Sequence, residues 1–197
     1  MRYAAEHKQQ TRERVLKEAA RAIREEGVQK VGVAAVMSKV GLTHGGFYAH
    51  FPSRDDFIAA GIDQMFLEGG QRLARSVEGR PPAEGLAAYV DFYLSRRHCD
   101  ARAEGCPLPF LSADAPRLAP VLRERIAAGM QGLTHRLGAC LLGMGHADPE
   151  AGAASLISEM VGAICLARIE PEPERSEAIL ARTRRALAER FSLNLTL

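Results

Sequence analysis

One stretch, residues 31–51 with the sequence VGVAAVMSKVGLTHGGFYAHF, constrains the fold of this 197-residue chain more than any other. Its first half repeats apolar residues at helical spacing: Val33, Val36, Met37 and Val40. That spacing predicts a helix with one apolar face. Gly41 follows at once, and glycine readily adopts the positive φ that a sharp reversal needs. The stretch therefore predicts a helix, a tight turn and a second short helix.

The second helix would begin after Thr43, whose hydroxyl can accept a hydrogen bond from a free amide of the first turn. Gly45 and Gly46 lie in that turn, although each glycine costs about 1 kcal/mol relative to alanine inside a helix. Close approach to another surface is a reason to omit side chains there. Phe47 and Phe51, four residues apart, can anchor the helix from behind. A short capped helix with a bare first turn suits the major groove of DNA.

The run GLTHGGFYAHFPSRDDF, which follows a predicted amphipathic helix over about residues 7–26, resembles the DNA-binding domain of TetR/AcrR-type transcriptional regulators. The resemblance is strong over about residues 11–57, and beyond them it rests on length and helical pattern. It implies an all-α fold of about nine helices, with a three-helix helix-turn-helix domain at residues 1–54. Residues 55–197 would form a C-terminal helical domain for ligand binding and dimerisation.

The resemblance and the local pattern together define a set of DNA contacts. We expect Thr43 and Tyr48 to meet phosphate, and His44, Gly45 and His50 to lie nearest the base edges. The full set of candidate DNA-binding residues is Arg12, Thr43, His44, Gly45, Gly46, Tyr48, His50 and Arg54. The chain departs from the family at Gly32, which stands where Ser or Thr usually begins the second helix, so we expect a weaker cap there.

Composition places the chain among ordinary globular proteins, with 47% hydrophobic and 25% charged residues. The net charge is only +2, but residues 1–60 carry ten Lys and Arg against seven Asp and Glu, the sign expected of a DNA-facing N-terminus. No apolar run approaches the roughly 20 residues of a membrane helix, and the first residues lack the apolar core of a signal peptide. These features predict a cytoplasmic protein that does not enter a membrane.

Further helices are predicted over about residues 53–78, 83–98, 120–142, 148–168 and 174–191, with a short turn at 110–113. The last two helices are apolar on more than one side, as an isologous four-helix interface requires. The residues of these faces are Leu156, Ile157, Met160, Val161, Ile164, Ile179, Leu180, Thr183, Leu187 and Phe191. By resemblance, this helix pair forms the seam of a homodimer; the alternative is that both helices simply close the core of the monomer.

A small-molecule site is predicted between the helices of the C-terminal domain, because polar tips on apolar walls are typical of such sites. The candidate lining residues are Phe66, Tyr89, Tyr93, Cys106, Phe110, Met130 and His135. Each of them could instead be ordinary core. Cys106, between Gly105 and Pro107, is either a half-buried loop cysteine or a reactive thiol whose pKa is lowered by the cationic residues near it in sequence.

Catalysis has little support, because the chain contains no GxSxG, Walker or HExxH motif and its four cysteines show no metal-binding spacing. We expect no catalytic residue, no metal and no cofactor. The predicted function is that of a homodimeric, DNA-binding transcriptional regulator, most simply a repressor released from double-stranded operator DNA by a small-molecule effector. The alternative is an all-α small-molecule-binding protein or enzyme whose helix-turn-helix is vestigial.

Overall fold

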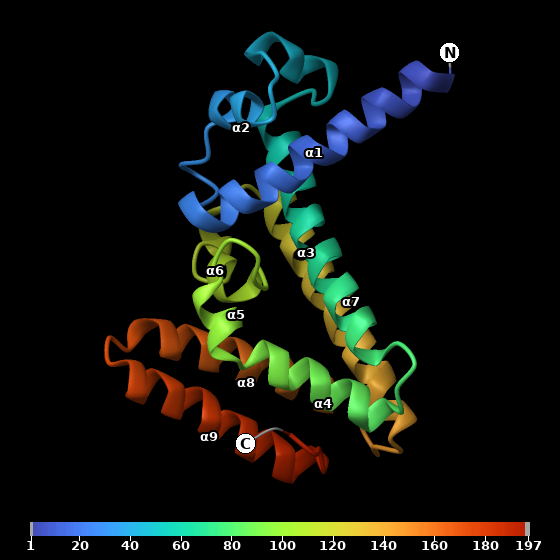
Figure 1. Ribbon diagram of the computed structural model, residues 1–197, viewed down its shortest axis with the longest axis vertical. Helices are drawn as coiled ribbons and strands as arrows, with labels where there is room; N and C mark the ends of the chain where they lie inside the picture. The colour runs from blue at the N-terminus through green and yellow to red at the C-terminus, as the bar shows by residue number, and fades with distance from the viewer. Residues whose placement is uncertain (1, 196–197) are drawn as a thin grey trace.

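The computed structural model describes residues 2–195, apart from the side chains of residues 2–5 and 44, and this part of the chain is helical without any strand (Figure 1). It contains nine α-helices, α1–α9, and two short 3₁₀ helices, η1 and η2. The predicted all-α class is therefore confirmed. One end of the molecule carries α1, α2 and η1, and the other carries α8 and α9 (Figure 1).

The N-terminal helices are α1 (Arg2–Glu26), α2 (Val33–Lys39) and η1 (His44–Ala49). Gly27, at φ +93°, follows the end of α1, and Gly41, at φ +75°, makes the predicted reversal after α2. Gly32 precedes α2 and gives it no side-chain cap, as expected. Behind η1, the rings of Phe47 and Phe51 stack with centroids 5.6 Å apart. These turns and rings fix η1 against the core.

The predicted second short helix is present as a 3₁₀ helix of six residues. The predicted cap is wrong, because the Thr43 hydroxyl makes no capping hydrogen bond. Gly45 and Gly46 lower the α-helix propensity of this segment. A 3₁₀ turn is the usual form of such short pieces.

Helix α3 (Arg54–Val77) connects the two halves of the molecule. Its predicted cap is confirmed, since Ser53 Oγ accepts a hydrogen bond from the Asp56 amide at 3.1 Å. Near its start α3 crosses α1, and a Cβ at Gly61 would lie only 2.6 Å from Ile23 Cδ1. Further along, α3 packs on α7 (Figure 1). Glycine thus lets α3 press closely on α1 before it enters the C-terminal domain.

The C-terminal domain contains α4 (Pro82–Tyr93), α5 (Arg96–Asp100), α6 (Leu108–Leu111), η2 (Ala115–Arg117), α7 (Pro120–Gly143), α8 (Pro149–Ile169) and α9 (Pro173–Phe191). The single helix predicted over residues 83–98 was wrong, because the chain breaks at residues 94–95. Ser95 starts a new helix there, its Oγ accepting from the His98 amide at 3.2 Å. The predicted start of α8 is confirmed, with Asp148 accepting from the Ala151 amide at 3.0 Å.

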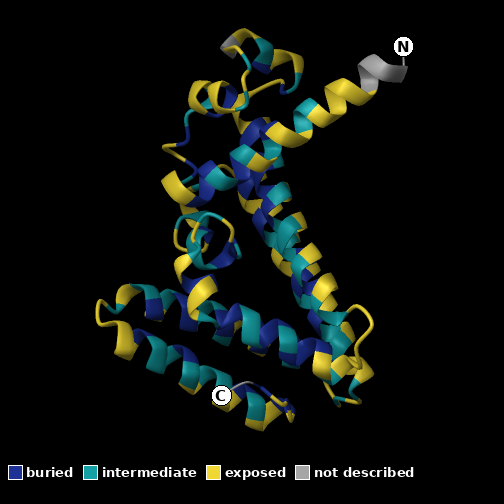
Figure 2. Cartoon of the chain, viewed as in Figure 1, coloured by how far each residue is buried: buried dark blue, intermediate teal, exposed yellow. Residues whose placement is uncertain are grey.

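Most apolar residues proposed for the dimer seam instead lie inside the protomer. Seven of them are buried, several completely: Leu156, Ile157, Met160, Ile164, Leu180, Leu187 and Phe191. The interpretation that both helices close the monomer core is correct for these residues, because α8 packs between α7 and α9. Figure 2 shows exposed residues beside buried ones on both α8 and α9. Two exposed residues of α8 are large and apolar, Leu166 at 58% and Ile169 at 75% exposure.

Helix α8 is long and apolar enough to cross a membrane by length and composition, since an 18-residue window within it has a mean hydropathy of 1.5, and 44% of that window is buried. Glu150, Glu159 and Arg168 interrupt its apolar residues, so the helix contains no continuous apolar run of membrane-spanning length. Its inward residues fill the core between α7 and α9. This is the ordinary reason for a long apolar helix inside a globular protein.

Candidate DNA-binding surface and ligand cavity

The first turn of η1 contains two residues without side chains, Gly45 and Gly46. Thr43 and Gly45 are exposed, and Gly46 is half-buried. A Cβ at Gly45 or Gly46 would have Thr43 Oγ1 as its nearest neighbour, at 4.0 and 3.8 Å, which is ordinary contact. The protomer therefore has room for side chains at both positions, and packing within it does not explain the glycines. An external surface that must come close to this turn would explain them.

Tyr48 is the largest exposed side chain of this turn, at 67% exposure. Its ring meets the buried Phe47 edge-to-face at 5.2 Å. The contact with Phe47 therefore holds the Tyr48 ring, most of which is exposed to solvent. The His44 side chain lies outside the described part of the structure.

The other predicted DNA contacts lie around this turn and are partly engaged within the domain. The Arg12 guanidinium lies over the Phe51 ring, 5.0 Å from its centroid. Arg54 Nη2 donates to the carbonyl oxygens of Val28 at 2.8 Å and Gln29 at 3.2 Å, which fastens the α1–α2 loop to the start of α3. His50 is half-buried, and burial, with the nearby cations of α1, lowers its pKa.

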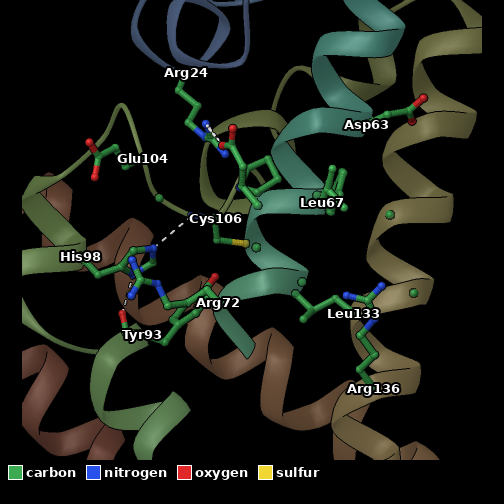
Figure 3. A pocket seen from close by; sticks show the side chains of 18 of the residues that line it. Arg24, Asp63, Leu67, Arg72, Tyr93, His98, Glu104, Cys106, Leu133 and Arg136 are labelled. Atoms are coloured by element: carbon green, nitrogen blue, oxygen red, sulfur yellow. Dashed lines mark hydrogen bonds and ion pairs between the residues drawn. The ribbon is translucent and has the colours of Figure 1, made fainter. Parts of the chain in front are cut away.

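A cavity of about 580 Å³ lies between the C-terminal part of α1, α3, α4, the segment joining α5 to α6, and α7 (Figure 3). Four predicted residues line it: Phe66, Tyr89, Tyr93 and Cys106. Sequence reasoning missed most of the charged wall, including Arg24, Arg72 and Arg136. A second hollow, of about 650 Å³, adjoins it along α3 and α7 on the side of Pro82.

Three predicted lining residues lie elsewhere. Met130 is 42% exposed and His135 is also exposed, because α7 turns Leu133 and Leu137 inward and leaves these two outside. Phe110 packs beneath the end of α1, its Cζ 3.8 Å from where a Cβ of Gly27 would be. The orientation of α7, which is fixed by the helices it packs against, decides the positions of Met130 and His135.

Arg24 joins the DNA-binding end to the wall of the cavity. Its side chain is 3% exposed and pairs with Glu68 Oε2 of α3 at 2.8 Å. Its guanidinium also donates to the carbonyl oxygens of Met65 at 3.4 Å and Ala103 at 3.3 Å. The sequence carried a signal for this role, since Arg24 follows Ala20 by four residues and so shares the apolar face of α1.

His98 holds the segment that brings Cys106 to the cavity. Its Nε2 accepts the Cys106 amide at 3.0 Å, so Nδ1 carries the proton and donates to the Tyr93 carbonyl oxygen at 2.6 Å. Burial lowers the His98 pKa to about 4, which keeps the imidazole neutral. If Nε2 were also protonated, its N–H would face the N–H of Cys106, and the hydrogen bond between them would be lost.

Of the two interpretations of Cys106, the half-buried loop cysteine is confirmed, and the thiol with a lowered pKa is wrong. Burial of the thiol raises its pKa, and the opposing influences of the Tyr93 hydroxyl, the Leu108 backbone, Arg24 and Arg168 are weaker. Arg168 instead donates to the Cys99 carbonyl oxygen at 2.9 Å. The arginines near Cys106 in sequence suggested a lowered thiol pKa, but burial of the thiol outweighs the effect of the nearby positive charges. Within the described residues, no cluster of three His, Cys, Asp or Glu side chains could hold a metal ion.

Two family models match the sequence. The model for bacterial regulatory proteins of the tetR family matches residues 15–60, and the tetracyclin repressor-like C-terminal domain matches residues 82–187. The HTH-type transcriptional regulator LmrA of Bacillus subtilis (strain 168) is 28% identical over 116 residues. That alignment covers 58% of this chain and 62% of LmrA, so it spans less than two thirds of the relative's length.

Solved structures match nearly the whole chain. The reduced form of NemR from E. coli superposes with a TM-score of 0.80 at 21% identity, over 91% of this chain and 96% of NemR. A TetR transcriptional regulator from Chloroflexus aurantiacus J-10-FL gives 0.79 at 24% identity, over 95% and 96%. At these identities the likeness establishes the fold.

A helix-turn-helix joined by one long helix to a helical domain with a cavity is the arrangement of a DNA-binding transcriptional regulator, and both family models agree with it. The chain belongs to the TetR family of bacterial regulatory proteins. Members of this family are regulators and not enzymes.

Proposed function

We propose that this regulator is a homodimeric repressor that binds a palindromic operator and leaves it when a small molecule occupies the cavity. The observation that carries the proposal is the position of the cavity, which is bounded by α1 and α3 as well as by the C-terminal helices. A ligand there touches the helices that hold η1. A ligand that prefers the DNA-incompetent state about 100-fold would supply about 2.7 kcal/mol of coupling.

In the proposed complex, Thr43 and Tyr48 contact phosphate, while His44 and His50 lie near base edges. Gly45 and Gly46 allow the backbone of η1 to approach the groove closely. Arg12 supplies further positive charge beside η1, and Arg54 acts by fixing the α1–α2 loop. Phosphate contacts of this kind position the protein, and base contacts select the sequence.

The proposed dimer joins the outer faces of α8 and α9 from two protomers. Exposed or half-buried small residues run along α8 at helical spacing: Ser155, Ser158 and Gly162. The exposed Leu166 and Ile169 continue the same face. Small residues permit close helix contact and the two apolar side chains would be covered, as an isologous interface requires. The dimer would place two η1 helices one DNA turn apart, in the cytoplasm.

The test is a gel shift with the DNA that flanks the protein's own gene and with a scrambled duplex of equal length. We expect the wild type to retard the flanking DNA selectively. Tyr48→Phe should weaken binding to both duplexes, because a phosphate contact carries no sequence information. A small-molecule extract or library that reverses the shift would identify an effector. Absence of selective retardation would refute the operator, and selective binding that Tyr48→Phe leaves intact would refute the assigned contact.

A further inference from the structure

Basic residues dominate the charged wall of the cavity. Six cationic side chains and three carboxylates line it: Lys17, Arg21, Arg24, Arg72, Arg75, Arg136, Asp63, Glu68 and Glu104. Two of the carboxylates are neutralised, Glu68 by Arg24 and Asp63 by Arg125. Arg21 pairs with Glu18 and Glu25. Within the described residues, four cations remain without an ion pair, against one carboxylate.

Two of these four cations come from α3 and α7, the neighbouring helices that pack on each other beside the cavity. Arg72 of α3 is half-buried, and its guanidinium stacks on the Phe92 ring at 4.4 Å from the centroid. Stacking on an aromatic face fixes a guanidinium plane while leaving its N–H edges able to donate. The planar fork of an arginine matches a carboxylate with two parallel hydrogen bonds.

Arg136 reaches the same cavity from α7. Its Nη1 lies only 1.8 Å from where a Cβ of Gly70 would be, so the guanidinium rests on the bare backbone of α3 (Figure 3). Any larger residue at position 70 would push it away. The absence of a side chain at Gly70 thus gives Arg136 its place beside the cavity.

The rest of the wall is apolar, with one polar exception. Phe66, Leu67, Tyr89 and Leu133 supply aromatic and aliphatic surface. The buried hydroxyl of Tyr93 interacts with the Cys106 thiol and has no oxygen or nitrogen partner within the described structure. A thiol is a weak hydrogen-bond partner, so a ligand oxygen would satisfy this hydroxyl better.

We propose that the effector is an organic monocarboxylate: an aromatic or aliphatic body that packs on the apolar wall, with its carboxylate held by Arg72 and Arg136. The inference rests on the proposed function, because it names the chemical class of the ligand for the same cavity. A cavity of about 580 Å³ is of ordinary size for a small-molecule site. Arg72 is half-buried and Arg136 is exposed, and the two can give a carboxylate charge-assisted hydrogen bonds that a neutral ligand would not receive.

The test compares carboxylates with their neutral amides by isothermal titration calorimetry at neutral pH and low salt. The probes are benzoate, 2-naphthoate and decanoate, each paired with its primary amide. We expect at least one carboxylate to bind tenfold or more tightly than its amide. Arg72→Gln and Arg136→Gln should each reduce that preference at least fivefold. Arg72→Lys should recover part of it, because the charge remains but the planar fork is lost.

The matched control is Arg123→Gln, an exposed arginine of α7 outside the cavity, which should keep the full preference. Thermal melting of the unliganded variants checks that each one folds. If no carboxylate binds better than its amide, or if folded Arg72→Gln and Arg136→Gln both keep the preference, the proposal is overturned.

A gel shift with the same proteins separates this proposal from the proposed function. Carboxylate binding that depends on both arginines but leaves the operator complex intact would refute effector release and uphold anion recognition. Release by neutral compounds alone would uphold effector release and refute anion recognition. If the unliganded protein does not bind operator DNA, the proposed function is refuted. The calorimetric comparison of carboxylates with amides then still decides whether the cavity recognises anions.

Discussion

Replacement of Arg24 by methionine tests the connection between the DNA-binding end and the cavity. Methionine keeps an unbranched apolar stem of similar reach and removes only the guanidinium. The change leaves Glu68, which is 30% exposed, without its ion-pair partner. It also releases the carbonyl oxygens of Met65 and Ala103. We expect a loss of stability and a loosening of the α5–α6 segment from α1.

The magnitude follows from the burial of the pair. Removing one partner of a fully buried ion pair costs about 3–5 kcal/mol, and an exposed pair is worth about 0–1 kcal/mol. Arg24 is almost fully buried, but Glu68 can turn towards water, and the two carbonyl contacts are long. The buried Nε of Arg24 has no partner among the described residues, so its removal returns some desolvation free energy. We therefore expect a net loss of about 2 kcal/mol.

For a chain of 197 residues, such a loss lowers the melting temperature by about 4–8 °C. Calorimetry or circular dichroism at one fixed protein concentration measures it, since dimerisation makes the midpoint concentration-dependent. Arg21→Met is the matched control on the same helix, because Arg21 pairs only with carboxylates of α1 in the described structure. A midpoint within 1 °C of wild type, or strict additivity with Glu68→Gln, would refute the coupling.

Three further predictions follow from buried groups and the outer face of α8. The pKa of His98 is about 4 in the folded protein and 6.5 ordinarily, so the unfolded chain takes up the proton first as the pH falls. The free energy of unfolding should therefore decrease by about 3 kcal/mol between pH 6.5 and 4 and stay constant below that range. Urea midpoints across that range should show a smaller decline for His98→Gln. Leu166→Asp combined with Ile169→Asp should give folded monomers in size-exclusion chromatography, whereas dimers that persist would exclude this face from the interface. Cys106 should react with a maleimide at pH 7 more slowly in the native than in the urea-unfolded protein, and equal rates would contradict the raised pKa.

The turns and helix starts were predictable because their causes lie within a few residues. Gly41 and Ser53 act through their own backbone and side-chain chemistry, and so does Asp148. The break before α5 had a similar local signal in Ser95, which the apolar periodicity of residues 83–94 obscured. The 3₁₀ form of η1 was also implicit in its two glycines.

The cavity was less predictable because it depends on contacts between residues far apart in sequence. Met130 and His135 were placed by composition, whereas the packing of α7 on α3 and α8 decides which side they occupy. Arg24 meets Glu68 across 44 positions, and Arg136 rests on Gly70 across 66. Apolar periodicity identifies the buried face of a helix but not the element that it packs against. The sequence therefore allowed Ile164 either in a dimer interface or in the protomer core, and it is fully buried within the protomer.

The proposed release mechanism needs only a small motion, because α3 is long and held at both ends. From Arg72 at the cavity to Arg54 at the start of α3 is 18 residues, or about 27 Å, so a tilt of about 5° about Arg72 moves that start by about 2.4 Å. In a symmetric dimer both η1 helices would shift, which changes their separation by about 5 Å against a half-site spacing near 34 Å. Because α3 packs closely on α1 at Gly61, a tilt of α3 would move α1 with it. Gly61→Ala should therefore disturb operator affinity more than it disturbs ligand affinity, since it separates α1 from α3 outside the cavity.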